Sequence, residues 1–105
     1  MIHRTVLVDT PFDLNNVCAG DGLLFVRDGV GYAGRGTHAS ADDAAIRLIL
    51  NDSVHSGHSS PIDLPLVGPI AFGIIPFLPQ EKSRFVIASA TFAKRVDGTH
   101  TLTLI

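Results

Sequence analysis

The sequence is poor in several residue types, and each shortage narrows what the chain can do. Its 105 residues include one cysteine, one tyrosine, one glutamate, two lysines and no tryptophan. A single cysteine excludes an internal disulfide, so a cytoplasmic location is expected, with Cys18 as a small buried apolar group. The eight Lys and Arg residues are scattered and the net charge is −2. No basic stripe is therefore available for nucleic acid, and no nucleic-acid partner is expected.

Long apolar runs are also missing, although the chain as a whole is apolar. No stretch approaches the roughly 20 residues of a membrane-crossing helix, so no membrane partner is expected. Apolar residues make up 46% of the chain and charged residues 17%, against about 25% charged in an average domain. This composition excludes a disordered tail. It predicts one domain or fragment over residues 1–105 that either buries its surface well or meets a partner surface.

Short apolar and β-branched runs predict strands, and two Asp-Gly pairs predict the turns that join them. Asp28-Gly29 and Asp97-Gly98 each separate two such runs, and a two-residue hairpin turn needs positive φ at both central positions. The strands expected from these runs are an edge strand at 5–8, a buried strand at 23–26, and further strands at 30–33, 66–70, 71–77, 84–87, 91–96 and 99–104.

One helix is predicted over Ala41 to Leu50, with Ser40 as its N-cap. Asp43 and Arg47 have the spacing of an i,i+4 ion pair. The apolar face is expected to consist of Ala41, Ala45, Leu48 and Ile49. A polar loop follows from residue 51 to residue 65. The order of elements predicts an α+β fold with a mainly antiparallel sheet, two Asp-Gly hairpins and one packed helix, because a doubly wound sheet needs alternating helices.

Four patterns could carry chemistry, and none is specific. Gly34-x-Gly36-x-x-Ala39 fits a dinucleotide-binding turn, but no parallel strand with an acidic tip is expected after the helix. His55 and His58 could share a metal only if the loop were ordered. Ser59, His58 and Asp63 are the residue types of a nucleophilic triad, but the sequence shows no oxyanion hole to accompany them. Asp42 and Asp43 point apart on a helix and suit its N-terminal dipole.

The segment from Leu66 to Val96 resembles the N-terminal region of isochorismate synthases, members of the chorismate-utilising enzyme family. In that region a strand ends in a Gly-x-x-Pro-Phe-x-Pro turn, and Gly73, Pro76, Phe77 and Pro79 occupy the matching places. Leu78 stands where many members have aspartate. The hairpin and helix upstream follow in the same order, so the resemblance covers about residues 22–96.

The resemblance implies that this chain forms part of a larger chorismate-utilising fold. Such enzymes add water at one ring carbon of chorismate while the hydroxyl at another leaves, with Mg²⁺ on the substrate carboxylate. Their lysine base, glutamate acid and metal-binding glutamates lie in a C-terminal region that this chain does not contain. One glutamate and two lysines cannot supply that set. No catalytic, cofactor-binding or metal-binding residue is therefore assigned, and no cofactor is expected in this segment.

Three readings of the function follow. In the first, the chain is the N-terminal structural portion of an isochorismate synthase-like enzyme, inactive alone, whose partner is the catalytic region or a second copy of itself. The sequence stops at Ile105 with no polar tail, and this also favours the interpretation that the chain is a fragment. In the second, the chain is a stand-alone binding or interaction module, with 70–77 as a ligand or partner face. A small enzyme using the histidine loop is a third, weaker possibility.

Overall fold

The computed structural model describes residues 2–52, 54–55, 68–74 and 83–105. This part of the chain has an α+β fold of mostly antiparallel sheets, as the sequence predicts. The strands are β1 Ile2–Leu7, β2 Leu23–Arg27, β3 Val30–Arg35, β4 Ala39–Ala41, β5 Val54–His55, β6 Ala71–Ile74, β7 Arg84–Ile87, β8 Ala90–Lys94 and β9 His100–Leu104. The helices are α1 Leu14–Cys18 and α2 Asp43–Asn51.

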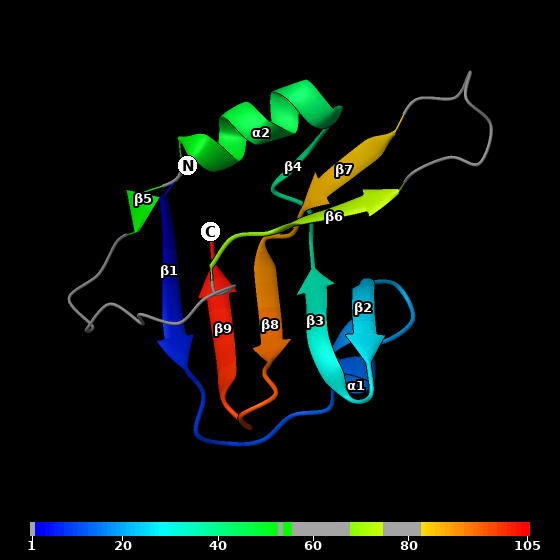
Figure 1. Cartoon of the computed structure of the whole chain (residues 1–105), viewed down its shortest axis with the longest axis vertical. Helices are drawn as coiled ribbons and strands as arrows, with labels where there is room; N and C mark the ends of the chain where they lie inside the picture. Colours follow the sequence, from blue (N-terminus) through cyan, green and yellow to red (C-terminus); the bar gives the residue numbers. More distant parts are fainter. Residues whose placement is uncertain (1, 53, 56–67, 75–82) are drawn as a thin grey trace.

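The strands form two sheets (Figure 1). One has six strands in the order β2-β3-β8-β9-β1-β5, and the other has three in the order β4-β7-β6. Every pair is antiparallel except β1 with β5. The edge strand predicted at 5–8 is correct in part. Ile2 and His3 at the start of β1 pair with β5, whereas Thr5 to Leu7 pair with β9 alone in the described residues. β2 and β5 are the two ends of the six-stranded order.

The first Asp-Gly hairpin is confirmed. Arg27 pairs with Val30, which leaves a two-residue turn in which Asp28 has φ 55° and Gly29 has φ 78°. Positive φ at both positions matches the right-handed twist of the two strands and fixes their register. This turn therefore determines which side chains of β2 and β3 share a face.

The second hairpin is present, but its turn is longer than a two-residue Asp-Gly turn. The Gly98 N–H donates to the Arg95 carbonyl at 3.0 Å, and the Arg95 N–H donates to the Thr99 carbonyl at 2.9 Å. Gly98 has φ 86°, whereas Asp97 does not have positive φ. This is a three-residue loop whose last residue is left-handed, and it places Arg95 beside Asp97.

The predicted helix exists, but it begins two residues later than expected. Asp42 is the N-cap, and its side chain accepts the Ala45 N–H at 2.9 Å. Ser40 belongs to β4, where its hydroxyl accepts a hydrogen bond from Arg84 Nε. The strand β4 was missed because three residues are too few to show a pattern. Asp43 and Arg47 do form the predicted pair, at 2.9 Å.

The apolar face of α2 also differs from the prediction. Ile46 is buried, whereas Leu48 is 71% exposed. The later start does not move residues around the helix axis, so the error lies in which side of α2 meets the sheet. α2 packs against β4 and β7, and sequence periodicity does not encode that contact.

Replacing Asp42 with alanine should cost about 1 kcal/mol of stability, because the Ala45 N–H loses its acceptor. Ser40→Ala is the matched control and should change stability by less than about 0.5 kcal/mol, since its hydrogen bond to Arg84 is exposed. Urea unfolding of both variants measures the difference. A larger loss of stability in Ser40→Ala than in Asp42→Ala would mean that Ser40 is the N-cap, as the sequence predicts.

A second helix, α1, was not predicted. Asp13 caps it by accepting the Asn15 N–H at 2.8 Å, and Ala19 ends it in the left-handed conformation with φ 52°. Leu14 is buried, and α1 packs against β2, β3 and β8. Asn15 and Asn16, two residues of modest helix propensity, lie inside this helix of five residues. Such a short helix depends on packing more than on propensity.

Four threonines lie in the centre of the six-stranded sheet and are buried, namely Thr5, Thr91, Thr101 and Thr103. Thr103 is opposite Thr5 on one side and Thr91 on the other, so three of them form a row across β1, β9 and β8. Thr5 Oγ1 and Thr103 Oγ1 are 2.8 Å apart and share a hydrogen bond. That bond offsets the cost of burying both hydroxyls.

The two sheets approach each other closely at Gly34 on β3. A Cβ on Gly34 would lie 2.8 Å from the Ala88 Cβ and 3.0 Å from the Phe72 ring. Gly73 is similarly tight, since a Cβ there would lie 2.7 Å from Phe85 Cε1. The absence of a side chain at Gly34 allows Phe72 of β6 to pack over the larger sheet, whereas Gly73 leaves room for the Phe85 ring within the smaller sheet.

Candidate functional site

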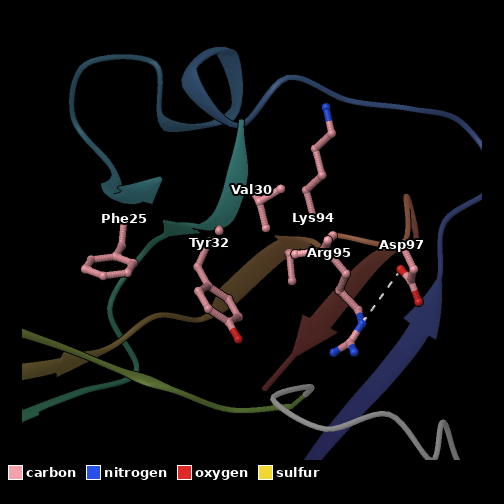
Figure 2. Close-up of a pocket in the computed structure, with 9 residues that line it drawn as sticks. Phe25, Val30, Tyr32, Lys94, Arg95 and Asp97 are labelled. Atoms are coloured by element: carbon pink, nitrogen blue, oxygen red, sulfur yellow. Dashed lines mark ion pairs between the residues drawn. The ribbon is translucent and has the colours of Figure 1, made fainter. Parts of the chain in front are cut away.

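A hollow of about 470 Å³ lies at the end of β3 and β8 and is lined mainly by apolar groups. Figure 2 shows Phe25, Tyr32 and Arg95 pointing to the same side of the sheet. Phe25 and Tyr32 are opposite each other on β2 and β3, and Tyr32 is opposite Ala93 on β8. The sheet register therefore brings two aromatic rings and one guanidinium to one place.

The charges at this hollow are partly balanced. Arg95 Nε lies 3.9 Å from Asp97 Oδ1, and the Arg95 side chain is largely buried while Asp97 is exposed. The Asp97 carboxylate also accepts the Thr99 N–H at 2.9 Å. Hydrogen bonds from Thr99 lower the pKa of Asp97, with a smaller contribution from Arg95. The carboxylate thus stays ionised at neutral pH and balances part of the Arg95 charge.

The Tyr32 hydroxyl is influenced by both its burial and Arg95. Burial raises the pKa of Tyr32 above its ordinary value of 10.0, and the positive charge of Arg95 lowers it by a smaller amount. Tyr32 is therefore a neutral phenol at pH 7. A neutral phenol and a guanidinium both donate hydrogen bonds, so this end of the hollow suits an acceptor such as a carboxylate. Lys94 points away from it (Figure 2).

Ultraviolet titration of the single tyrosine should give a pKa above 10.0 in the folded chain. Arg95→Gln should raise that pKa further, since it removes the charge that favours phenolate. The folded state holds this proton more tightly than the unfolded state, so stability should fall as the pH rises above about 10. A lower pKa in Arg95→Gln would contradict this arrangement, and Arg4→Gln, far from the hollow, serves as the control.

A second hollow of about 520 Å³ lies beside the first, between β2 and the segment from Ile70 to Gly73. Phe25 and Tyr32 border both hollows. The prediction that β2 is a buried strand is wrong, because Phe25 is 72% exposed and Leu24 is 42% exposed. These two side chains lie on opposite faces of β2, so both faces of the strand present apolar surface.

The glycine pattern at 34–39 does not form a dinucleotide-binding turn. Gly36 has φ 71°, but the chain then enters β4, and the helix begins only at Asp43. A parallel strand does follow the helix, since β5 pairs with β1, but its two residues Val54 and His55 carry no acidic group. That strand lies at the far edge from β3, so it does not complete a βαβ unit around the glycines.

The remaining sequence candidates are not brought together by the described part of the chain. The backbone of His55 lies in β5, whereas His58, Ser59 and Asp63 fall outside the described residues. Pro76, Phe77 and Pro79 also fall outside them. Among the residues that are described, no group of three His, Cys, Asp or Glu side chains could hold a metal ion. Asp42 and Asp43 serve α2, as the cap and as half of an ion pair.

Sequence reasoning missed Phe25, Tyr32 and Arg95 as neighbours. The Asp28-Gly29 turn carried a usable signal, because its two-residue length places Phe25 opposite Tyr32. Arg95 could not be found this way, since its position depends on the pairing of β3 with β8, some 60 residues later in the chain.

No protein-family model matches the chain, and neither a curated protein nor a solved structure shows significant similarity to it. In the described ranges, no helix is long and apolar enough to cross a membrane.

Proposed function

We propose that this chain is the N-terminal structural portion of an isochorismate synthase-like enzyme and has no catalytic activity alone. In this proposal the two sheets supply a scaffold surface, and the catalytic region of the parent enzyme packs on it. Chorismate chemistry, with its Mg²⁺, would belong to that region. The role of the present residues is to form and hold the interface.

The exposure of β2 carries this proposal. Strands with apolar residues at successive positions are typical of sheets that are covered on both faces. β2 has the run Leu23-Leu24-Phe25-Val26, yet Leu24 and Phe25 are exposed on opposite faces and the outer edge of the strand is unpaired in the described residues. Further protein surface over this strand would remove that apolar area from water, at about 25 cal/mol per Å².

The glycine that opens the family-like turn gives independent support. Gly73 matches the first position of the Gly-x-x-Pro-Phe-x-Pro pattern, and a Cβ there would lie 2.7 Å from Phe85 Cε1 on β7, so the ring would have to shift. A glycine needed for strand packing fits a shared structural role for that motif. The prolines and Phe77 of the pattern lie outside the described residues, so the argument uses Gly73 alone.

The direct test is an assay of the purified chain with chorismate and Mg²⁺, with isochorismate measured by chromatography. We expect no conversion above that of buffer. Turnover that co-purifies with the chain and disappears in Arg95→Gln would overturn the proposal. The coding frame beyond the Ile105 codon gives a second test: continuation into a catalytic region supports the proposal, and an immediate stop codon contradicts it.

A further test uses the protein encoded by the whole reading frame. Phe25→Asp should reduce isochorismate formation at least tenfold or make the protein insoluble, because it puts a charge at the proposed internal interface. Val96→Asp is the matched control, since Val96 is exposed on the loop between β8 and β9 and should keep activity within twofold. Equal behaviour of both variants would count against packing on β2.

The second candidate function is a stand-alone module that binds a small aromatic carboxylate. The observation that favours it is the hollow with Phe25 and Tyr32 as walls and Arg95 at its polar end. Titration with benzoate, followed by nuclear magnetic resonance, should then shift the Tyr32 and Arg95 amides selectively and saturate. Saturable shifts that vanish in Arg95→Gln but not in Arg84→Gln would favour this module over the scaffold.

A further inference from the structure

We propose that two copies of this chain associate through β2, forming an antiparallel pair with its two-fold axis at Phe25. The result would be one continuous sheet of twice six strands. This proposal concerns the same uncovered strand as the proposed function. It does not depend on the family assignment, because it rests on the outer edge of β2, which is unpaired in the described part of the chain.

The hydrogen-bonding direction of each β2 residue follows from the first hairpin. Arg27 and Val30 close a two-residue turn and exchange both backbone hydrogen bonds. Antiparallel pairs alternate, so Leu23, Phe25 and Arg27 bond inward to β3. Leu24 and Val26 therefore direct their N–H and C=O groups outward. No backbone bond to either residue from another loop or strand occurs in the described part of the chain.

The two-fold at Phe25 uses all of these outward groups. It places Leu24 of each copy opposite Val26 of the other, so each such pair exchanges two hydrogen bonds and the dimer gains four. Phe25 then faces Phe25 of the second copy in a pair without mutual hydrogen bonds, where side chains lie closest. The most exposed aromatic residue of β2 is thereby covered by its own counterpart, as an aromatic pair.

The neighbouring register is poorer. A two-fold at Leu24 would place Gly22 opposite Val26 of the second copy, but the Gly22 N–H already donates to the Cys18 carbonyl at 2.8 Å. That register would also leave Phe25 facing Leu23 and without an aromatic partner. Since a shift by one residue changes every opposing pair, the two registers make different predictions.

The charges at the two ends of β2 are each close to balanced. Arg27 is followed directly by Asp28, and Asp21, just before the other end, is paired with Arg35. The direction of pairing therefore follows from the hydrogen-bond alternation and from the aromatic pair at Phe25. The net charge of −2 per chain adds little repulsion between copies.

Cysteine cross-linking tests the register. In a Cys18→Ala background, Phe25→Cys should form a covalent dimer under mild oxidation, because opposed residues of such a pair lie within disulfide reach. Leu24→Cys is the matched control: its counterpart in the second copy is Val26, so its cross-linking should be at least tenfold slower. Equal rates, or faster cross-linking of Leu24→Cys, would overturn the Phe25 register.

Amide exchange of the unmodified chain tests the interface without a substitution. With rising concentration, the Leu24 and Val26 amides should gain protection together, while those of Leu23 and Phe25 stay protected throughout. In parallel, sedimentation should show the mass rising from 11.1 kDa toward twice that value. A monomer at millimolar concentration, or a dimer in which the Leu24 and Val26 amides stay unprotected, would refute the proposal.

Two further variants separate this proposal from the function proposed above. Leu24→Pro removes an outward N–H without touching the β2–β3 ladder, and proline is tolerated at such edge positions. It should weaken association at least tenfold and leave the fold intact, whereas Leu48→Pro, inside α2, should unfold the helix. If Leu24→Pro associates normally, the interface is wrong, and the chorismate assay remains unaffected by that result.

Discussion

Gly31→Ala should be among the most destabilising single-methyl additions in this chain. Gly31 sits in β3 with φ 151°, and a Cβ there would collide with the carbonyl oxygen of Phe25 and approach Val26 Cα to 3.0 Å. The obstacle is the backbone of the paired strand, which cannot rotate away as a side chain can. We expect a loss of about 3 kcal/mol or more, equivalent to roughly 12–24 °C in Tm.

Gly29→Ala is the control for this prediction. Gly29 also has positive φ, but nothing lies within 4 Å of the position a Cβ would take. Its substitution should cost only the strain of placing an L-residue at positive φ, about 1–2 kcal/mol. Thermal unfolding of both variants separates collision from backbone strain, and equal losses would mean that β2 can move away from Gly31 at little cost.

Truncating Ile87 should have the second large effect. Ile87 is fully buried and is among the largest such side chains in the described residues, and it lies on β7 opposite Ala39 and Ala71. Ile87→Ala removes apolar contacts and leaves a cavity where the three strands of the small sheet meet, at a cost of about 2–5 kcal/mol. Urea unfolding should show a lower midpoint with an unchanged slope.

Two companion variants sharpen this test. Ile87→Val should cost about 0.5–1.5 kcal/mol, in proportion to the single carbon removed. Ile2→Ala is the exposed control, because Ile2 is 65% exposed on β1, and it should change stability by less than about 0.5 kcal/mol. If Ile2→Ala were as damaging as Ile87→Ala, the core would have to be placed nearer to β1.

The parts of the fold that could be predicted are those specified by neighbouring residues. The Asp28-Gly29 hairpin follows from a turn that few other residues can make, and the pair formed by Asp43 and Arg47 follows from helical spacing. The mainly antiparallel α+β class follows from the order of these local elements. Each of these features depends on residues within about ten positions of one another.

The parts that could not be predicted depend on distant pairing. The sequence of β1 does not reveal that β5 joins its first two residues. Leu48 was assigned to the core because helical periodicity marks an apolar stripe without naming the strands it meets. The site shows the same limit, since Tyr32 and Arg95 become neighbours only when β3 pairs with β8. The family resemblance concerned function, and it remains a proposal.

The pairing of β1 with β9 has a consequence for biosynthesis. Thr5 and Thr103 are hydrogen-bonded across 98 positions of the chain, and Arg4 is opposite Leu104. During translation β1 leaves the ribosome first but must wait for β9, roughly 5–20 s at ordinary elongation speeds. Throughout that interval the nascent chain has a half-built sheet with an open strand. Co-expression of a ribosome-bound holdase chaperone should therefore raise the yield of soluble protein. The increase should exceed that from a substitution that only slows unfolding of the finished fold.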